Sequence, residues 1–131
     1  GYVHDELDPG GETKFGISRK SFPDLDIANL TKEQAVQIYR EKYWQPVVSF
    51  TGEDTSDPQI LWKLFDIAVN MGPGTAEAFW GKMDVLLSKS NDRILHDLSA
   101  LQMKRYALLI KARPHLVKYL SGWTTRAMEI G

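Results

Sequence analysis

The sequence predicts a predominantly helical α+β fold with a small irregular or β segment at the N-terminus. Two patterns predict it: a strong turn signal interrupts the first 18 positions, and from position 31 onward apolar residues recur at helical spacing. The 131 residues contain no cysteine, and 43% are hydrophobic, so one core can form without disulfides. We therefore expect a single domain over residues 1–131, with one half in 1–60 and a helical half in 61–131.

Residues 1–18 are expected to be irregular or to form a hairpin. Residues 8–11 read Asp-Pro-Gly-Gly, a strong turn signal between two short pieces that contain apolar residues. Four acidic residues and no basic residue fall within positions 1–12, namely Asp5, Glu6, Asp8 and Glu12. Carboxylates on a glycine-rich loop can flank a scissile bond, bind a cation or accept a proton. The plainer interpretation is a solvated turn that Asp8 opens.

The first predicted helix runs from Thr31 to Tyr43, because residues 31–34 form a candidate capping box. A second, densely apolar helix begins behind Asp57 and Pro58 and ends near Asn70. Its apolar density predicts a buried central helix.

Residues 71–74, Met-Gly-Pro-Gly, break that central helix. A further helix is expected over 75–88. The next begins at a cap on Asn91 and stops at Pro114. Two short helices, over 115–120 and 123–128, complete the prediction.

Several kinds of chemistry lack support. The sequence has no nucleophile elbow, no phosphate-binding loop and no dinucleotide fingerprint. Its three histidines are scattered without the spacing of metal ligands, so we expect no metal site and no cofactor. The net charge of -1 argues against a general nucleic-acid binder. The tryptophans offer flat faces on which sugar rings can stack, although aromatic residues at helical spacing are usually core.

Charge is unevenly distributed along the chain. Residues 1–65 carry eleven acidic and seven basic residues. From position 100 onward there are six basic residues and a single acidic one, Glu129. The basic end is either a solvated helix face or a surface that docks to a polyanion. No apolar run approaches the roughly 20 residues that span a bilayer, and no signal peptide is visible at Gly1. We expect no stable membrane insertion.

Taken together, these segments resemble a known family. Gly1–Val3 and Asp8–Ser18 resemble the opening signature of glycoside hydrolase family 108, the bacterial and phage N-acetylmuramidases with a lysozyme-like fold. The resemblance continues in Leu30–Thr31, Ala35, Ile38–Tyr39, Tyr43–Trp44, Phe65–Gly72, Gly122–Trp123 and Arg126. By this resemblance, residues 1–60 are the catalytic-loop half, and residues 61–131 are similar to the family's predicted peptidoglycan-binding region.

The resemblance implies a glycosidase that cleaves the β-1,4 bond between N-acetylmuramic acid and N-acetylglucosamine. It implies peptidoglycan as the partner, action in the periplasm or at the cell wall, and an endolysin-type, bacteriolytic role in a phage, prophage or bacterium. We expect a monomer. The general-acid glutamate of the family stands two positions before the glycine that aligns with Gly1, so this chain as given is expected to lack it. The alternative is a non-catalytic peptidoglycan-binding or secretion-associated module with the same fold.

The resemblance also indicates site residues. Phage-type lysozymes follow their acid with an aspartate nine positions later and then a threonine, an order that Asp8 and Thr13 reproduce. Asp8 is expected to stay ionised and to position water or stabilise the oxocarbenium-like transition state, with Thr13 orienting the water. For substrate binding, Tyr2 lies next to the expected acid and contacts a sugar, and Asn70 either faces the cleft or caps its helix. Gly10 and Gly11 are expected to let the polysaccharide approach the backbone closely, because glycine has no Cβ.

Overall fold

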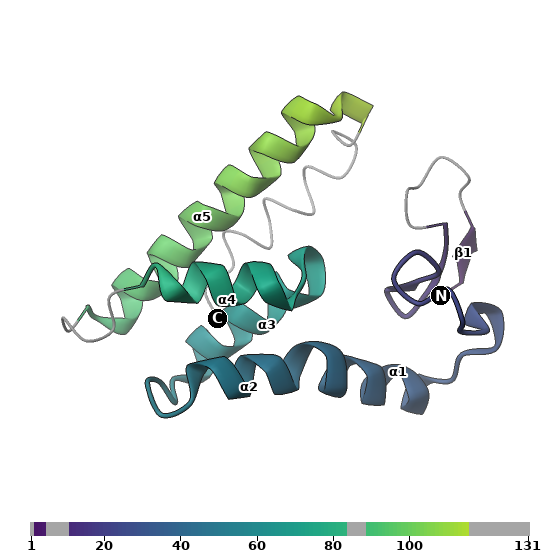
Figure 1. Ribbon diagram of the computed structural model, residues 1–131, viewed down its shortest axis with the longest axis horizontal. Coiled ribbons are helices and arrows are strands. Elements are labelled where there is room, and N and C mark those ends of the chain that lie inside the picture. Colours follow the sequence, from purple (N-terminus) through teal and green to yellow (C-terminus); the bar gives the residue numbers. More distant parts are fainter. Residues whose placement is uncertain (1, 5–10, 84–88, 116–131) are drawn as a thin grey trace. The chain divides into compact units, whose positions relative to one another are not determined.

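The computed structural model describes residues 2–4, 11–83 and 89–115 of the chain (Figure 1). The chain divides into two compact units, residues 1–41 and residues 42–131. The first carries a small sheet and one α-helix, and the second is built from helices packed on one another. Each unit has a hydrophobic core of its own.

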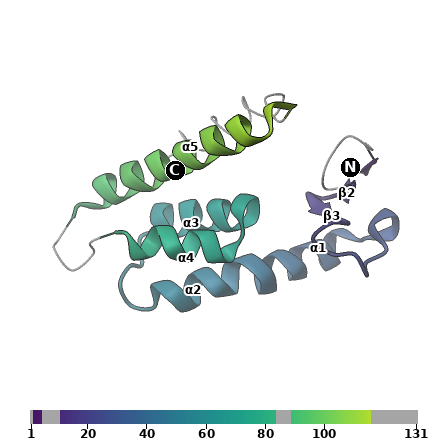
Figure 2. The same cartoon turned by 45° about the horizontal axis from the view of Figure 1, so that its top comes forward.

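The sheet of the first unit has three antiparallel strands in the order β1-β2-β3. They are β1 (Val3–His4), β2 (Glu12–Lys14) and β3 (Ile17–Ser18) (Figures 1 and 2). In β2, Thr13 is paired with Val3 on one side and with Ser18 on the other. The predicted turn over residues 8–11 falls mostly outside the described residues, of which Gly11 is one.

A two-residue turn, Phe15–Gly16, joins β2 to β3, and both of its residues have positive φ angles, +54° and +77°. This conformation matches the twist of a tight hairpin but is uncommon for a bulky residue such as Phe15. Tyr39 holds the turn from outside, because its hydroxyl donates to the Phe15 carbonyl oxygen at 2.6 Å. A Cβ on Gly16 would also collide with the Tyr39 hydroxyl, so glycine is required there.

The other elements of the first unit are the short 3₁₀ helix η1 (Ile27–Asn29) and α1 (Lys32–Tyr39). Thr31 and Gln34 form the predicted capping box at the start of α1. A small core joins the helices to the hairpin through Ile17, Ile27, Leu30 and Ala35.

Helical structure continues past the predicted end at Tyr43. A π-helical segment, η2 (Arg40–Trp44), follows α1 and leads directly into α2 (Gln45–Thr51). The prediction was wrong here because Pro46 falls in the first turn of α2, where a missing N–H costs nothing.

The central helix of the second unit is α3 (Pro58–Met71), and its prediction is confirmed. The Asp57 carboxylate accepts from the backbone N–H groups of Gln59 and Ile60 at 2.9 and 3.0 Å, which caps the helix. Four of its residues are fully buried: Ile60, Leu64, Ile67 and Ala68. Gly72 ends it at a φ of +94°. The flanking helices α2 and α4 (Pro73–Gly81) pack against α3 (Figures 1 and 2).

Two helix starts differ from prediction. Helix α4 begins at Pro73 instead of position 75, because proline is favoured at the first helical position, and it ends at Gly81 instead of continuing to 88. Helix α5 (Asn91–Ala112) is capped by Ser90, whose Oγ accepts from the Arg93 N–H at 3.1 Å. The side chain of Asn91, the predicted cap, donates instead to Asp57 at 2.9 Å. The two short helices predicted over 115–120 and 123–128 fall outside the described residues, apart from His115.

A buried polar network joins α3 to α5. Lys63 is 2% exposed and donates to the Gln102 side-chain oxygen at 3.3 Å. The Gln102 amide nitrogen lies 3.2 Å from Asp66 and 3.4 Å from the Tyr106 hydroxyl. None of the helices in the described residues is both long and apolar enough to cross a membrane.

Candidate active site

Of the six predicted site residues, Tyr2, Gly11 and Thr13 lie together on the sheet of the first unit. Gly11, with a φ of +70°, immediately precedes β2. Thr13 is the middle residue of β2 and is half-buried. Tyr2 adjoins β1, which pairs with β2. The structure therefore brings these three residues onto neighbouring backbone, while Asp8 and Gly10 fall outside the described residues.

Thr13 carries one of the two predicted catalytic groups. Its hydroxyl makes no hydrogen bond to any side chain or backbone group of the described part of the chain. Successive side chains of a strand point to opposite faces, so Thr13 faces away from the side that carries Glu12 and Lys14. A half-buried hydroxyl of this kind can bind a water molecule or a sugar hydroxyl.

On the other face, Glu12 is the centre of a small charged cluster. Its residue is only 9% exposed, and the Tyr2 hydroxyl donates to Glu12 Oε2. Arg19 donates to Glu12 Oε1 through Nε at 2.6 Å and through its terminal nitrogen at 2.5 Å. Both carboxylate oxygens are therefore engaged. Glu12 is thus a buried carboxylate that accepts from Tyr2 and forms an ion pair with Arg19.

The same contacts set the ionisation of Tyr2. The hydrogen bond to Glu12 raises the pKa of Tyr2 above its ordinary value of 10.0, desolvation and the Glu12 charge act in the same direction, and Arg19 opposes them. Tyr2 remains a neutral donor at physiological pH. With 45% of its surface exposed, the ring is still open to a ligand.

The hairpin that carries Thr13 is fixed to the rest of the first unit by two hydrogen bonds. Tyr39 donates to Phe15 as described above, and Lys14 Nζ donates to the Ala28 carbonyl oxygen of η1 at 2.9 Å. The Lys14 ammonium also lies 5.6 Å from the centre of the Phe15 ring. These contacts hold β2 in a defined position relative to η1 and α1.

Asn70 belongs to the second unit, near the end of α3. It is exposed, and its amide nitrogen donates to the Asp66 carbonyl oxygen at 2.8 Å and to the Asp66 carboxylate at 3.1 Å. The side chain of Asn70 is therefore engaged within its own helix, and both roles considered for it, facing a cleft or capping the helix, stay predictions. Asp66 in turn contacts the buried Gln102.

Sequence reasoning missed two features that the structure brings forward. Arg19 was not singled out, although a two-residue turn at Phe15–Gly16 places Glu12 opposite Arg19 by register alone. The second feature is a pocket beside η1 and α1, whose residue Gln34 was considered only as a helix cap. Within the described residues no three histidine, aspartate or glutamate side chains are grouped closely enough to hold a metal ion.

Comparisons with known proteins place the chain in a family. None of the curated protein sequences compared with it matches significantly. The structure of Brucella abortus SagA is similar at a TM-score of 0.73 and 26% sequence identity, covering 97% of this chain and 81% of that one. The predicted fold class is confirmed: an α+β, predominantly helical, lysozyme-like fold. The sequence model of glycosyl hydrolase 108 matches residues 1–72, more than half of the chain. The chain therefore belongs to the glycosyl hydrolase 108 family.

Proposed function

We propose that this glycosidase-type protein is an N-acetylmuramidase, cleaving the β-1,4 bond between N-acetylmuramic acid and N-acetylglucosamine in peptidoglycan. The observation that carries the proposal is the family match over residues 1–72, which include the sheet and its loop. Family membership supports peptidoglycan as the substrate and the cell wall or periplasm as the place of action. An endolysin-type role and a monomeric state are part of the proposal.

In the proposed mechanism a carboxylic acid protonates the glycosidic oxygen, while a second group positions the attacking water. Asp8 is assigned the second role: as a carboxylate it orients the water, takes its proton or stabilises the positive charge at the anomeric carbon. Thr13 assists, and its half-buried place in the middle of β2 supports this role. Tyr2, Gly10, Gly11 and Asn70 are assigned to the substrate.

The general acid is assigned to the glutamate that the family places two positions before Gly1. Glu12 is a poor substitute for it, because both of its oxygens already accept hydrogen bonds from Tyr2 and Arg19. A neutral carboxyl group is needed to donate a proton, whereas an arginine partner favours the charged form. The engaged state of Glu12 therefore argues for an acid elsewhere.

The engagement of both Glu12 oxygens also favours a second candidate function. If no carboxyl group stands in the acid position of the natural protein, the fold serves as a non-catalytic peptidoglycan-binding module. The two functions differ in the products they predict, since only the enzyme releases new reducing ends.

The test is digestion of purified peptidoglycan by this chain and by a version extended at its N-terminus with Glu-Gly, the residues that the family's opening has before the glycine aligned with Gly1. Muropeptides are then identified by mass spectrometry. New reducing N-acetylmuramic acid ends are expected, and Asp8→Asn is expected to lower the rate at least about a hundredfold, in the range of a lost acid–base group. Asp24→Asn, at an exposed aspartate away from β2, serves as the matched control.

Reducing N-acetylglucosamine ends would contradict the muramidase assignment, and full activity of Asp8→Asn would contradict the role of Asp8. Binding to peptidoglycan without any product would support the binding module instead.

A further inference from the structure

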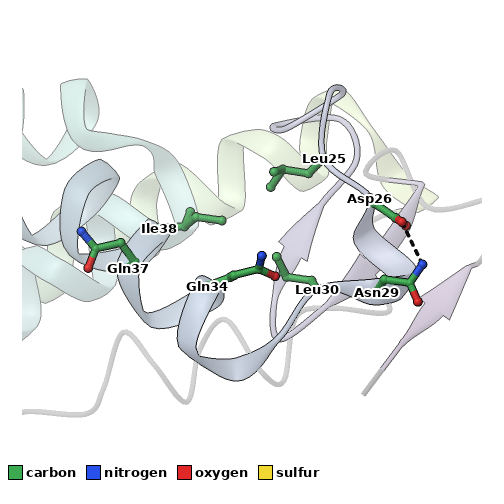
Figure 3. Close-up of a pocket in the computed structure, with 7 residues that line it drawn as sticks. All are labelled: Leu25, Asp26, Asn29, Leu30, Gln34, Gln37 and Ile38. Atoms are coloured by element: carbon green, nitrogen blue, oxygen red, sulfur yellow. Dashed lines mark hydrogen bonds between the residues drawn. The ribbon is translucent and has the colours of Figure 1, made fainter.

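A pocket of about 470 Å³ opens between η1 and α1, lined entirely by residues 25–38 of the first unit. Its volume falls in the range of roughly 300–1,000 Å³ that is usual for small-molecule sites. Leu25, Leu30 and Ile38 provide its apolar surface and belong to the edge of the small core. Figure 3 shows these three side chains gathered at the centre, with Asp26 and Asn29 at one end and Gln37 at the other.

The first polar group of the pocket is a hydrogen-bond donor. Gln34 is oriented by the capping box, in which its Oε1 accepts from the Thr31 backbone N–H at 2.9 Å. The amide nitrogen is therefore the end left over, and it has no acceptor among the residues that the structure describes. Helix capping thus presents two N–H protons of Gln34 to the pocket.

The other two amides have their nitrogen atoms engaged by carboxylates. The Gln37 amide nitrogen donates to Glu41 at 2.6 Å, which leaves Gln37 Oε1 as the open end. The Asn29 amide nitrogen donates to Asp26 at 2.8 Å, which leaves Asn29 Oδ1. The apolar floor and the Gln34 donor beside it complement a methyl group attached to an amide carbonyl.

The charge of the pocket narrows the choice of ligand. Asp26 is its one charged lining residue, and no lysine or arginine lines it. A carboxylate-bearing ligand would be repelled, so a neutral ligand is favoured. In peptidoglycan, a methyl group beside a secondary amide occurs in the N-acetyl group of the sugars and in alanine of the peptide stem, and the stem is acidic.

We propose that this pocket binds the N-acetyl group of a neutral N-acetylhexosamine. The methyl group packs on Leu30 and Ile38, and the carbonyl oxygen accepts from Gln34 Nε2. The inference rests on the proposed function for the identity of the polymer. The pocket and Thr13 are parts of one unit, joined by the Lys14 to Ala28 and Tyr39 to Phe15 hydrogen bonds.

The experiment is an NMR titration of the ¹⁵N-labelled full chain with two trisaccharides. Chitotriose carries N-acetyl groups, and cellotriose has the same β-1,4 backbone without them. Chitotriose is expected to shift the Gln34 side-chain amide signals in a saturable way, and cellotriose is expected to leave them unchanged. The dipeptide L-alanyl-D-isoglutamine tests the peptide stem and is expected to bind more weakly than chitotriose.

The decisive variant is Gln34→Glu, because glutamate keeps an oxygen that caps Thr31 and replaces the donor nitrogen by a second, charged oxygen. Its thermal unfolding should match the parent, whereas its affinity for chitotriose should fall about tenfold. Gln59→Glu makes the same change in the first turn of α3, at an exposed position outside the pocket, and should bind like the parent.

Equal binding of cellotriose, tighter binding of the dipeptide, or unchanged affinity of Gln34→Glu would each overturn the inference. These results are independent of the proposed muramidase activity. Chitotriose binding that depends on Gln34, found in a protein that releases no muramic acid ends, would overturn the enzyme assignment and leave the pocket assignment in place.

Discussion

Glu12 accepts hydrogen bonds from residues on both sides of its strand, and this ties the N-terminal sheet together. Tyr2 reaches it from beside β1, and Arg19 from just beyond β3. A hydrogen bond to a charged group contributes more than one between neutral groups, and this carboxylate is only 9% exposed. At this position, a carboxylate in the acidic N-terminal segment has a structural role.

Tyr2 should titrate above the ordinary tyrosine range. Its pKa is raised mainly by the hydrogen bond to Glu12, so the bond contributes to stability below pH 10 and is lost as the pH rises through the raised pKa. Glu12→Gln should lower the Tyr2 midpoint and Arg19→Gln should raise it further. The measurement is a pH titration of ¹³Cζ-labelled tyrosines by NMR, with Tyr2→Phe for assignment; a midpoint unmoved in Glu12→Gln would contradict it.

Gly16→Ala should destabilise the protein by about 2 kcal/mol, because alanine disfavours a φ of +77° and its Cβ would meet the Tyr39 hydroxyl. Urea unfolding measures this loss. Gly74→Ala, in α4 with open space around the added Cβ, is the control and should stabilise by about 0.5 kcal/mol. In a Tyr39→Phe background the cost of Gly16→Ala should be smaller; an unchanged cost would exclude the clash.

Single residues were predicted well where local chemistry decides. Thr31 and Asp57 cap their helices as expected, since a cap depends only on neighbours in sequence. Ser90 and Asn91 are both good caps side by side, and the choice depends on Asp57, 34 positions away, which engages Asn91. The pocket donor of Gln34 was missed because its role depends on the surrounding fold. The roles of Asp8, Thr13, Tyr2, Gly10, Gly11 and Asn70 remain predictions.

At the scale of elements, proline is the residue whose interpretation most affected the predicted boundaries. Pro58 was correctly placed at the start of α3. Pro46 and Pro73 also stand in first turns, although Pro73 was taken as part of a break and no helix was predicted to include Pro46. Proline ends one helix and starts the next by the same property, the missing N–H. Whether a proline only ends one helix or also starts another depends on how the residues that follow it pack in the fold.

The contact between α3 and α5 should depend strongly on Gln102. Its side chain is fully buried and bonds Lys63, Asp66 and Tyr106, so Gln102→Leu leaves a buried ammonium group with one fewer acceptor. We expect a loss of about 2–3 kcal/mol in the free energy of unfolding. Gln59→Leu, at an exposed position on α3, should change it by less than about 0.5 kcal/mol.

A double variant, Lys63→Met with Gln102→Leu, separates the network from simple packing. It removes the buried charge together with its acceptor, so it should be less destabilised than the sum of the two single variants. Additive losses in urea unfolding would show that the polar contact itself contributes little.

At the scale of the whole molecule, the sequence predicted the fold class because its evidence is spread along the chain. The turn-rich start, the capped α1, the central α3 and the break at Gly72 each agree with a lysozyme-like α+β fold. Errors of a few residues at helix ends do not alter that pattern. The division into compact units at Glu41 and Lys42 follows from packing within each core, which composition does not reveal.

The basic end of the chain is predicted to help hold the protein on the anionic cell wall. Four of its cations, Lys104, Arg105, Lys111 and Arg113, are exposed on or just after α5. Lys111→Glu with Arg113→Glu should reduce the fraction that pellets with purified wall, and added salt should reduce it for the parent. Lys20→Glu with Lys32→Glu makes the same charge change at exposed positions of the first unit.

Equal losses in both double variants would indicate that net charge alone matters. If neither added salt nor the changes at Lys111 and Arg113 alter the fraction that pellets with the wall, the electrostatic interpretation is refuted.

The two ends of the Gln34 amide have separate tasks, one in folding and one in the proposed recognition of ligand. A protein engineer who improved the start of α1 by the usual capping preferences would choose glutamate at this position. The product would melt at the same temperature or higher, express as well, and give the same circular dichroism spectrum. Screens based on stability would accept it, and the loss would emerge only when the sugar was added.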